Sequence, residues 1–237
     1  MNDEELLDRV REMHERGSSP KRIAKALGLR PSAVAPLVRQ IASLQQTHAD
    51  PASRALLGCW ISPGWSAGLG LDDAPPQWAA ADPMGATDPA TGGLAKVLIA
   101  RQERASRASV CGFLVDLYCL GVKDALGPVV MGSGSLTTYS RDYFAAFDAP
   151  ALPAPIDLAQ NLVHGAVAYA HALGFEPAPD YADVAPYLGT PDIPAPIRFG
   201  RDGTPFYFAG PHDNPSAVVR TLEATVGPGN YHYVAAL

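Results

Sequence analysis

The chain has 237 residues, of which 47% are hydrophobic and 18% are charged, and it carries a net charge of −6. This length is enough for one large domain or two modest ones. No apolar run approaches the roughly 20 residues that a membrane helix needs, and residues 1–5 are acidic where a secretory signal would be basic. Three cysteines at no zinc-finger spacing predict neither a disulfide framework nor a metal site. We therefore expect a cytoplasmic protein with no membrane partner, no metal and reduced thiols in its core.

The charge is distributed unevenly along the chain. Residues 1–46 hold eight basic and six acidic side chains, a charge of +2, whereas residues 47–237 hold ten basic and eighteen acidic ones, a charge of −8. A basic segment attached to an acidic one suits a polyanion at one end of the chain only, because the acidic part would repel phosphates.

Three short helices are predicted near the start of the chain. Apolar residues recur at helical spacing in each, glycines end the first two, and a proline lies at the start of the second and third. The expected helices span residues 4–16, 20–27 and 31–45. Their apolar faces would be formed by Leu6, Leu7, Val10, Met13, Ile23, Ala24, Leu27, Val34, Leu37, Val38 and Ile41.

The stretch from residue 4 to residue 46 resembles the helix-turn-helix family of nucleic-acid-binding modules. The resemblance rests on a small residue in the second helix, a glycine four positions later, an apolar residue after the turn and an apolar pair in the third helix. These residues are Ala24, Gly28, Leu29, Val34 and Leu37. A small residue lets two helices approach, and glycine adopts the left-handed conformation that ends a helix. The resemblance implies DNA or structured RNA as the partner of this segment.

Reading a base sequence needs long polar side chains on the exposed face of the third helix, but that face offers Pro31, Ser32, Ala35, Pro36 and Arg39. Pro36 is expected to kink this helix or to confine it to a start near Ala35. We therefore expect contacts mainly to phosphates, which position a protein without specifying a sequence. The candidate contact residues are Lys21, Arg22, Lys25, Arg30, Ser32 and Arg39. The alternative is a small docking or dimerisation module.

Residues 47–93 are rich in Gly, Pro, Ala and Asp and show no periodicity. They also contain Trp60, Trp65 and Trp78, which a disordered linker would seldom carry. We therefore expect an ordered loop region packed on the following domain, with the tryptophans either in the core or around a pocket. The expected organisation is a helix-turn-helix head over residues 1–46, this loop region over 47–93 and an α+β domain over 94–237.

The last part of the chain predicts a mixed or antiparallel sheet domain with two main helices, so the fold class is α+β. The expected elements are strands over 94–100 and 109–120 joined by a charged turn, a helix over 157–173, strands over 197–199 and 206–208 that form a second hairpin, a helix over 215–226 and a strand over 230–236. In the helix over 157–173, Asp157 would be the cap, Gln160 would complete a capping box, and Asn161, His164, Ala168 and His171 would form a solvated stripe.

Asp116 is an acid within an apolar strand, where even a neutral unpaired polar group costs roughly 2 to 7 kcal/mol. Lys123 and Asp124 follow it closely, and the three could bind an ion or act as acid and base if the chain gathered them. His212 is a further candidate because it lies with Asp213 at a helix N-terminus, which favours anions. The structural alternatives are an Asp116 to Lys123 ion pair, an aspartate satisfied by backbone amides, and simple capping by Asp213.

No nucleophile elbow, phosphate-binding loop, dinucleotide fingerprint or zinc-protease helix occurs, so no cofactor is expected. Segments 115–123 and 199–203 resemble uncharacterised proteins of GC-rich bacteria, which imply no activity; fourteen arginines against four lysines agree with such a source. The leading hypothesis is a cytoplasmic DNA-binding regulator or RNA-binding protein whose body binds a ligand, a protein partner or a second copy of the chain. The alternatives are an enzyme with an acidic site around Asp116, Lys123, Asp124 and His212, and a protein-docking adaptor.

Overall fold

The computed structural model describes residues 3–48, 50–80, 82, 93–147, 150–194 and 197–235. The contacts within the chain divide it into two compact units, Met1–Asp50 and Pro51–Leu237. The predicted α+β class is confirmed, since three helices are followed by an antiparallel sheet with helices on both faces. The expected loop region contributes a strand and a short helix to the second unit, and its residues 83–92 lie outside the described part of the chain.

The first unit consists of α1 (Asp3–Glu15), α2 (Pro20–Leu27) and α3 (Pro31–His48). Ser19 caps α2 by accepting a hydrogen bond from the amide of Arg22, and Pro20 fills the first helical position. Gly28 ends α2 in the left-handed conformation, with φ at 67°, which glycine adopts without a steric cost. The unit has its own buried core, formed by Val10, Ile23, Ala24, Val34 and Ile41.

The third helix departs from the sequence-based expectation at Pro36. It begins at Pro31 and continues through Pro36, so the expectation of a start near Ala35 is wrong. The proline removes the backbone hydrogen bond that would reach the carbonyl of Ser32. Pro36 and Ser32 are both exposed, so water can satisfy this carbonyl near the helix start and the helix tolerates the loss.

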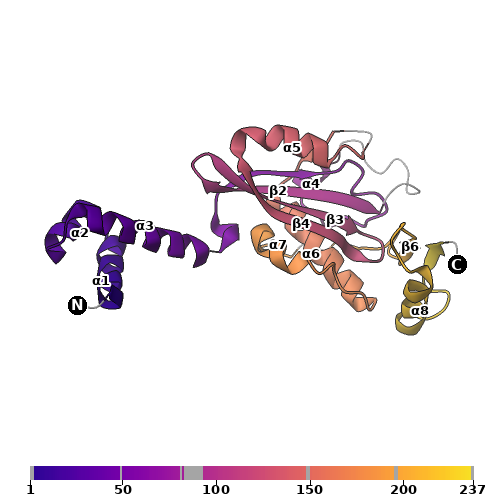
Figure 1. The fold of residues 1–237 in the computed structure, drawn as a ribbon. Coiled ribbons are helices and arrows are strands. Elements are labelled where there is room, and N and C mark those ends of the chain that lie inside the picture. Colours follow the sequence, from indigo (N-terminus) through magenta and orange to yellow (C-terminus); the bar gives the residue numbers. More distant parts are fainter. Residues whose placement is uncertain are drawn as a thin grey trace. The chain divides into compact units, whose positions relative to one another are not determined.

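The second unit is built on a five-stranded antiparallel sheet in the order β4-β3-β2-β1-β5 (Figure 1). The three longest strands are consecutive: β2 (Leu94–Arg104), β3 (Arg107–Asp116) and β4 (Gly121–Gly132). They are joined as hairpins, and β1 (Leu56–Ile61) adds to the free side of β2. The two-residue β5 (Leu152–Pro153) pairs with β1 at the sheet edge.

Helices cover both faces of this sheet, so most side chains of β2 and β3 are buried. In Figure 1, α5 (Leu136–Tyr143) lies on one face, and α6 (Ile156–Ala172) and α7 (Tyr181–Leu188) lie on the other. The core under α6 and α7 is the larger one; its buried members include Ile61, Val97, Ile99, Phe113, Val115, Leu158, Leu162 and Leu188. The core under α5 includes Leu98, Ala100, Val110 and Phe144.

Three short helices and a small parallel strand pair complete the second unit. The helices are η1 (Pro51–Ser53), α4 (Pro76–Ala80) and η2 (Ser133–Ser135). The chain after α7 forms β6 (Phe206–Phe208), α8 (Pro215–Thr225) and β7 (His232–Val234), in which the two strands are parallel and α8 connects them. Buried Tyr207 and Leu222 pack with Cys119 and Leu173, which attaches this segment to the β3–β4 turn and to the end of α6.

The first predicted hairpin has a shorter turn than expected. Strand β2 continues to Arg104, so Arg101 lies within the strand and is 5% exposed, and the prediction of a charged turn at this position is wrong. Arg101 is buried because its guanidinium donates hydrogen bonds to three backbone carbonyls, those of Arg54, Tyr187 and Leu188. A buried charge is tolerated when its donors are satisfied in this way.

The second predicted hairpin is reduced to an isolated antiparallel bridge between Arg201 and Thr204, and its two predicted strands do not pair with each other. Phe206–Phe208 pairs in parallel with His232–Val234, and the segment before it instead forms a bridge between Arg198 and Gly70. Both backbone hydrogen bonds of this bridge measure 3.0 Å. The strand expected up to residue 120 also ends at Asp116, where a turn leads into β4.

Candidate functional site

Five exposed basic side chains of the first unit follow residue 16, and we call them the basic surface: Lys21, Arg22 and Lys25 on α2, Arg30 in the turn, and Arg39 on α3. The three on α2 share one helix face, since they are spaced three and four residues apart. The acidic residues of residues 1–46 all precede residue 16, and none occurs from residue 16 to residue 48. The basic surface is therefore free of acidic neighbours on its own two helices.

Ion pairs in the described part of the first unit lie around α1. They join Arg11 to Asp8 at 3.2 Å and Arg16 to Glu12 at 2.7 Å. None involves the basic surface, whose described polar contact is a hydrogen bond of 3.3 Å from Arg39 Nε to the carbonyl of Ala35 within α3. Five cations that lack an acidic partner are available for anions from outside the chain.

The exposed face of α3 carries few groups that could read bases. Its exposed described side chains are Pro31, Ser32, Ala33, Pro36 and Arg39, of which only Ser32 and Arg39 can form hydrogen bonds. All six candidate contact residues are exposed.

Asp116 closes the turn between β3 and β4. Its Oδ1 accepts hydrogen bonds from the amides of Tyr118, at 2.9 Å, and Cys119, at 3.0 Å. The carboxyl is 6% exposed, and burial raises its pKa to about 6, although the amide hydrogen bonds and the charge of Lys123 act in the opposite direction. This geometry matches the interpretation of an aspartate satisfied by backbone amides.

Asp116 should therefore make the stability of the protein depend on pH. Its carboxyl keeps a proton up to about pH 6 in the folded chain and loses it near pH 4 in the unfolded chain, so the folded state binds more protons between these values. The free energy of unfolding should then fall as the pH rises from 4 to 7, by about 3 kcal/mol from this group alone. Asp116→Asn keeps an oxygen acceptor for the turn and removes the titration.

Urea unfolding at several pH values measures this effect as the difference between wild type and Asp116→Asn. We expect the free energy of unfolding of Asp116→Asn to rise relative to that of the wild type as the pH rises. The control is the same comparison for Asp124→Asn, an exposed acid on β4. A difference that is flat across this pH range would contradict the elevated pKa of Asp116.

The proposed acidic set is only partly brought together. Lys123 Nζ pairs with Asp213 Oδ2 at 2.8 Å, and Asp213 also accepts hydrogen bonds from the amide of Gly210 and the hydroxyl of Tyr207. These bonds and the charge of Lys123 lower the pKa of Asp213 against the opposing effect of burial. The partner of Lys123 is therefore Asp213 rather than Asp116, and this pair ties β4 to the loop before α8.

The other two members of the set lie elsewhere. Asp124 is exposed, and its charge acts on Tyr143 at the end of α5, where burial and then this charge raise the tyrosine pKa. His212 is exposed and directly precedes Asp213 of the partly buried pair, and the structure gives it no described polar contact. The charge of Lys123 acts on Asp116, but the described contacts do not join Asp116, Lys123, Asp124 and His212 in one cluster.

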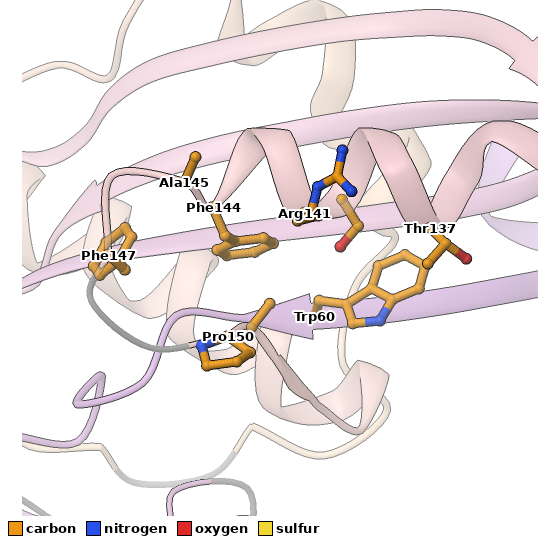
Figure 2. Close-up of a pocket in the computed structure, with 9 residues that line it drawn as sticks. Trp60, Thr137, Arg141, Phe144, Ala145, Phe147 and Pro150 are labelled. Atoms are coloured by element: carbon orange, nitrogen blue, oxygen red, sulfur yellow. The ribbon is translucent and has the colours of Figure 1, made fainter.

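A cavity of about 470 Å³ lies between β1, α5 and the segment that follows α5 (Figure 2). Its walls are largely aromatic or small, with Trp60, Phe144 and Phe147 the largest, and its cation Arg141 already pairs with Asp142 at 2.9 Å. Trp60 thus lines this pocket, Trp65 is buried in the core, and Trp78 is buried in the core and also lines a second cavity. The described lining of this cavity is therefore largely apolar and contains no buried charged group.

A second cavity, of about 560 Å³, lies on the opposite face of the sheet at the start of α6. The predicted capping box is wrong here: Pro155 is the cap residue, Asp157 Oδ2 accepts a hydrogen bond of 3.1 Å from Trp78 Nε1, and Gln160 donates to the carbonyl of Leu188. The side chains of Asp157 and Gln160 therefore do not cap α6. They bind groups of α4 and of the end of α7 instead.

The predicted solvated stripe on α6 is also wrong for two of its four residues, while Ala168 is exposed as predicted. Asn161 is buried and donates to the carbonyl of Asp157, and His164 lies between the carbonyl of Gly189 and the hydroxyl of Tyr181, at 2.7 and 2.8 Å. His171 is exposed as expected. The sequence did contain a signal for these buried polar groups. Asn161 and His164 lie one turn apart on α6, and most of their neighbours on this helix are apolar.

Neither a metal centre nor a reactive thiol is present among the described residues. No group of three His, Cys, Asp or Glu side chains that could hold an ion occurs there. All three cysteines are free and buried, and burial raises the pKa of Cys59 to about 12, which keeps this thiol protonated. In the same residues, no helix combines the length and the apolar character needed to cross a membrane.

Comparisons of the chain with protein-family models, with curated proteins and with solved structures find no match. The function is therefore inferred from the chemistry of the two surfaces that this chain presents, the basic surface of the first unit and the polar cavity of the second.

Proposed function

We propose that the protein binds DNA or structured RNA through its first unit, with phosphates as the main contacts. The observation that carries this proposal is the basic surface, in which five exposed cations have no acidic residue between positions 16 and 48. Phosphate contacts supply most of the affinity of nucleic-acid-binding proteins that do not read sequence. The acidic second unit disfavours phosphate contacts elsewhere, so the partner should bind at this end of the chain.

The start of α3 adds a second contribution to phosphate binding. Its first turn, Pro31 to Val34, contains no acid, and the helix is 18 residues long. Pro31 has no amide hydrogen, and the amides of Ala33 and Val34 donate to the carbonyl of Arg30. The amide of Ser32 is therefore the donor of this turn that can face a phosphate oxygen, which the partial positive charge of the helix N-terminus also favours. Arg30 directly precedes this turn, and the exposed hydroxyl of Ser32 can donate a further hydrogen bond. The α2–Gly28–α3 segment is arranged in the order that a helix-turn-helix module requires.

Fluorescence anisotropy of the full chain with a labelled mixed-sequence DNA duplex and with a labelled RNA hairpin tests this proposal. If the five cations neutralise five phosphates, the logarithm of the DNA affinity should fall against the logarithm of salt with a slope of about −4.5. Between 50 and 200 mM salt, this slope corresponds to a loss of roughly 500-fold in affinity. Whichever of the DNA duplex and the RNA hairpin binds with the higher affinity identifies the class of nucleic acid that the protein prefers.

Two outcomes would overturn the proposal. One is the absence of binding to both ligands at the lower salt concentration. The other comes from a pull-down of the tagged chain from a cell extract, divided into nuclease-treated and untreated halves. A stable protein partner that survives nuclease, together with no nucleic acid in the untreated half, would identify the first unit as a protein-docking module.

A further inference from the structure

The cavity at the start of α6 combines a buried polar floor with an apolar mouth. Its volume of about 560 Å³ is in the range of small-molecule sites. Trp78, Arg101, Asp157 and Asn161 belong to its polar side, whereas the partly exposed Leu56 and the exposed Ile193 belong to its apolar side. Such a combination suits a small ligand that has one polar end and one apolar end.

The polar side is held rigidly in place. Arg101 is 5% exposed and Asn161 is 6% exposed, and both donate to backbone carbonyls, Arg101 to the end of α7 and Asn161 within α6. Gln160 and His164 add hydrogen bonds from α6 to the carbonyls of Leu188 and Gly189. The cavity wall is thus preformed by contacts between α6 and α7, which reduces the entropy cost of binding.

Asp157 is the group best placed to bind a ligand. Its Oδ2 accepts the indole hydrogen bond of Trp78 at 3.1 Å, and this is the one hydrogen bond to its carboxylate among the described residues. A carboxylate can accept several hydrogen bonds, so Oδ1 keeps its capacity. Its charge is felt by the neighbouring thiol of Cys59, where it acts to raise the pKa. Asp157 therefore brings a carboxylate with remaining hydrogen-bonding capacity to the cavity wall, in the first turn of α6.

The charges around the cavity favour a cation. Among the described residues that line it are two acids, Asp157 and Asp192, and one cation, Arg101, which gives this described lining a net charge of −1. The guanidinium of Arg101 is already oriented toward the carbonyls of Arg54, Tyr187 and Leu188. We propose that this cavity binds a small organic amine, with its ammonium group at Asp157 and its hydrocarbon body against Leu56, Ile156 and Ile193. This proposal goes beyond nucleic-acid binding and does not depend on it.

A matched set of three probes tests the proposal: 3-methylbutylamine, 3-methylbutanol and 3-methylbutanoate, which share one hydrocarbon body and differ in charge. The readout is the indole N–H resonance of Trp78 in a nitrogen–proton correlation spectrum, assigned by its loss in Trp78→Phe. Because this N–H donates to Asp157, an ammonium group at the same carboxylate should shift it. We expect saturable shifts with the amine, at least about tenfold tighter than with the alcohol, and none with the carboxylate.

Two variants locate the binding. Asp157→Asn keeps an acceptor for Trp78 and removes the charge, and it should weaken amine binding by about tenfold or more. Asp183→Asn, an exposed acid on α7 outside the cavity, should bind the amine as the wild type does. Equal binding of the carboxylate probe, unchanged amine binding by Asp157→Asn, or no shift with any probe up to about 10 mM would each overturn the proposal. None of these measurements contains nucleic acid, so their failure leaves the proposal for the first unit standing.

Discussion

Replacing Lys21, Arg22 and Lys25 together with glutamate is expected to abolish nucleic-acid binding by the full chain. All three side chains are exposed on one face of α2, so the change removes three phosphate contacts and places three repelling charges in the same positions. Charge-assisted hydrogen bonds contribute about 1.5 to 3 kcal/mol each, which predicts a loss of at least about a thousandfold in affinity. A variant in which the three residues become glutamine should still bind, with a salt slope smaller by about 3.

The matched control is a triple glutamate variant of Arg104, Arg107 and Arg220, which are exposed in the second unit. It changes the net charge of the protein by the same amount and should lose little affinity. Because Lys21, Arg22 and Lys25 lie outside the core of the first unit, circular dichroism should show unchanged helix content in the α2 variant. Equal loss of affinity in both triple variants would mean that net charge matters and that α2 has no special role.

Replacing Arg101 with methionine is expected to destabilise the second unit by about 3 to 5 kcal/mol. Methionine fills a similar volume but donates no hydrogen bond, so the carbonyls of Arg54 and Tyr187 lose the guanidinium donor, and the carbonyl of Leu188 keeps only the hydrogen bond from Gln160. The last two carbonyls end α7, so the helix also loses a favourable charge at its C-terminus.

Urea unfolding followed by tryptophan fluorescence measures this loss, because Trp65 and Trp78 are buried in the core of the second unit. Arg104→Met is the control, since Arg104 is exposed on the same strand and should change the stability by less than about 0.5 kcal/mol. If Arg101→Met were as stable as the control, the buried guanidinium would be dispensable, and replacement by an apolar group would cost nothing.

The helices of the first unit could be predicted because their signals are local. Ser19 and Pro20 start α2, Gly28 ends it, and the apolar stripe of each helix reaches the core that the structure shows. Only the effect of Pro36 was misjudged, because its cost depends on whether water reaches one carbonyl near the helix start. Local chemistry also placed α6 and the Asn214 cap of α8, whose side chain accepts from the amide of Ala217 at 3.1 Å.

The second unit was harder to predict because its elements depend on distant partners. Buried and exposed residues alternate poorly along strand β4, and Val129 and Val130 near its end are exposed. This segment is a strand because it pairs along β3. The two-residue β5 has no signal of its own and exists through β1. Parallel pairing of β6 with β7 likewise replaces the hairpin that the glycines near Asp202 suggested.

The same limit applied to the candidate sites. Exposed cations on a predicted helix could be identified directly, whereas the polar cavity could not, because Trp78, Arg101 and Asp157 come from three separated segments. Asp116 was recognised as a buried acid from its apolar neighbours, but its acceptor role follows from the turn that it closes. The partner of Lys123 lies 90 residues further along the chain, at Asp213, and spacing gives no indication of it.

The hydrogen bonds of Arg101 also bear on the order in which the protein can fold as it is synthesised. Strands β2, β3 and β4 follow one another and pair as hairpins, so their hydrogen bonds can form soon after translation of each strand. Two acceptors of Arg101, however, lie 86 and 87 residues later. Until α7 leaves the ribosome, the nascent sheet holds a cation on a face that will become buried. A growing chain that stops before α7 therefore leaves the part of this sheet face near Arg101 uncovered. Water or a chaperone must then keep that part of the face from aggregating.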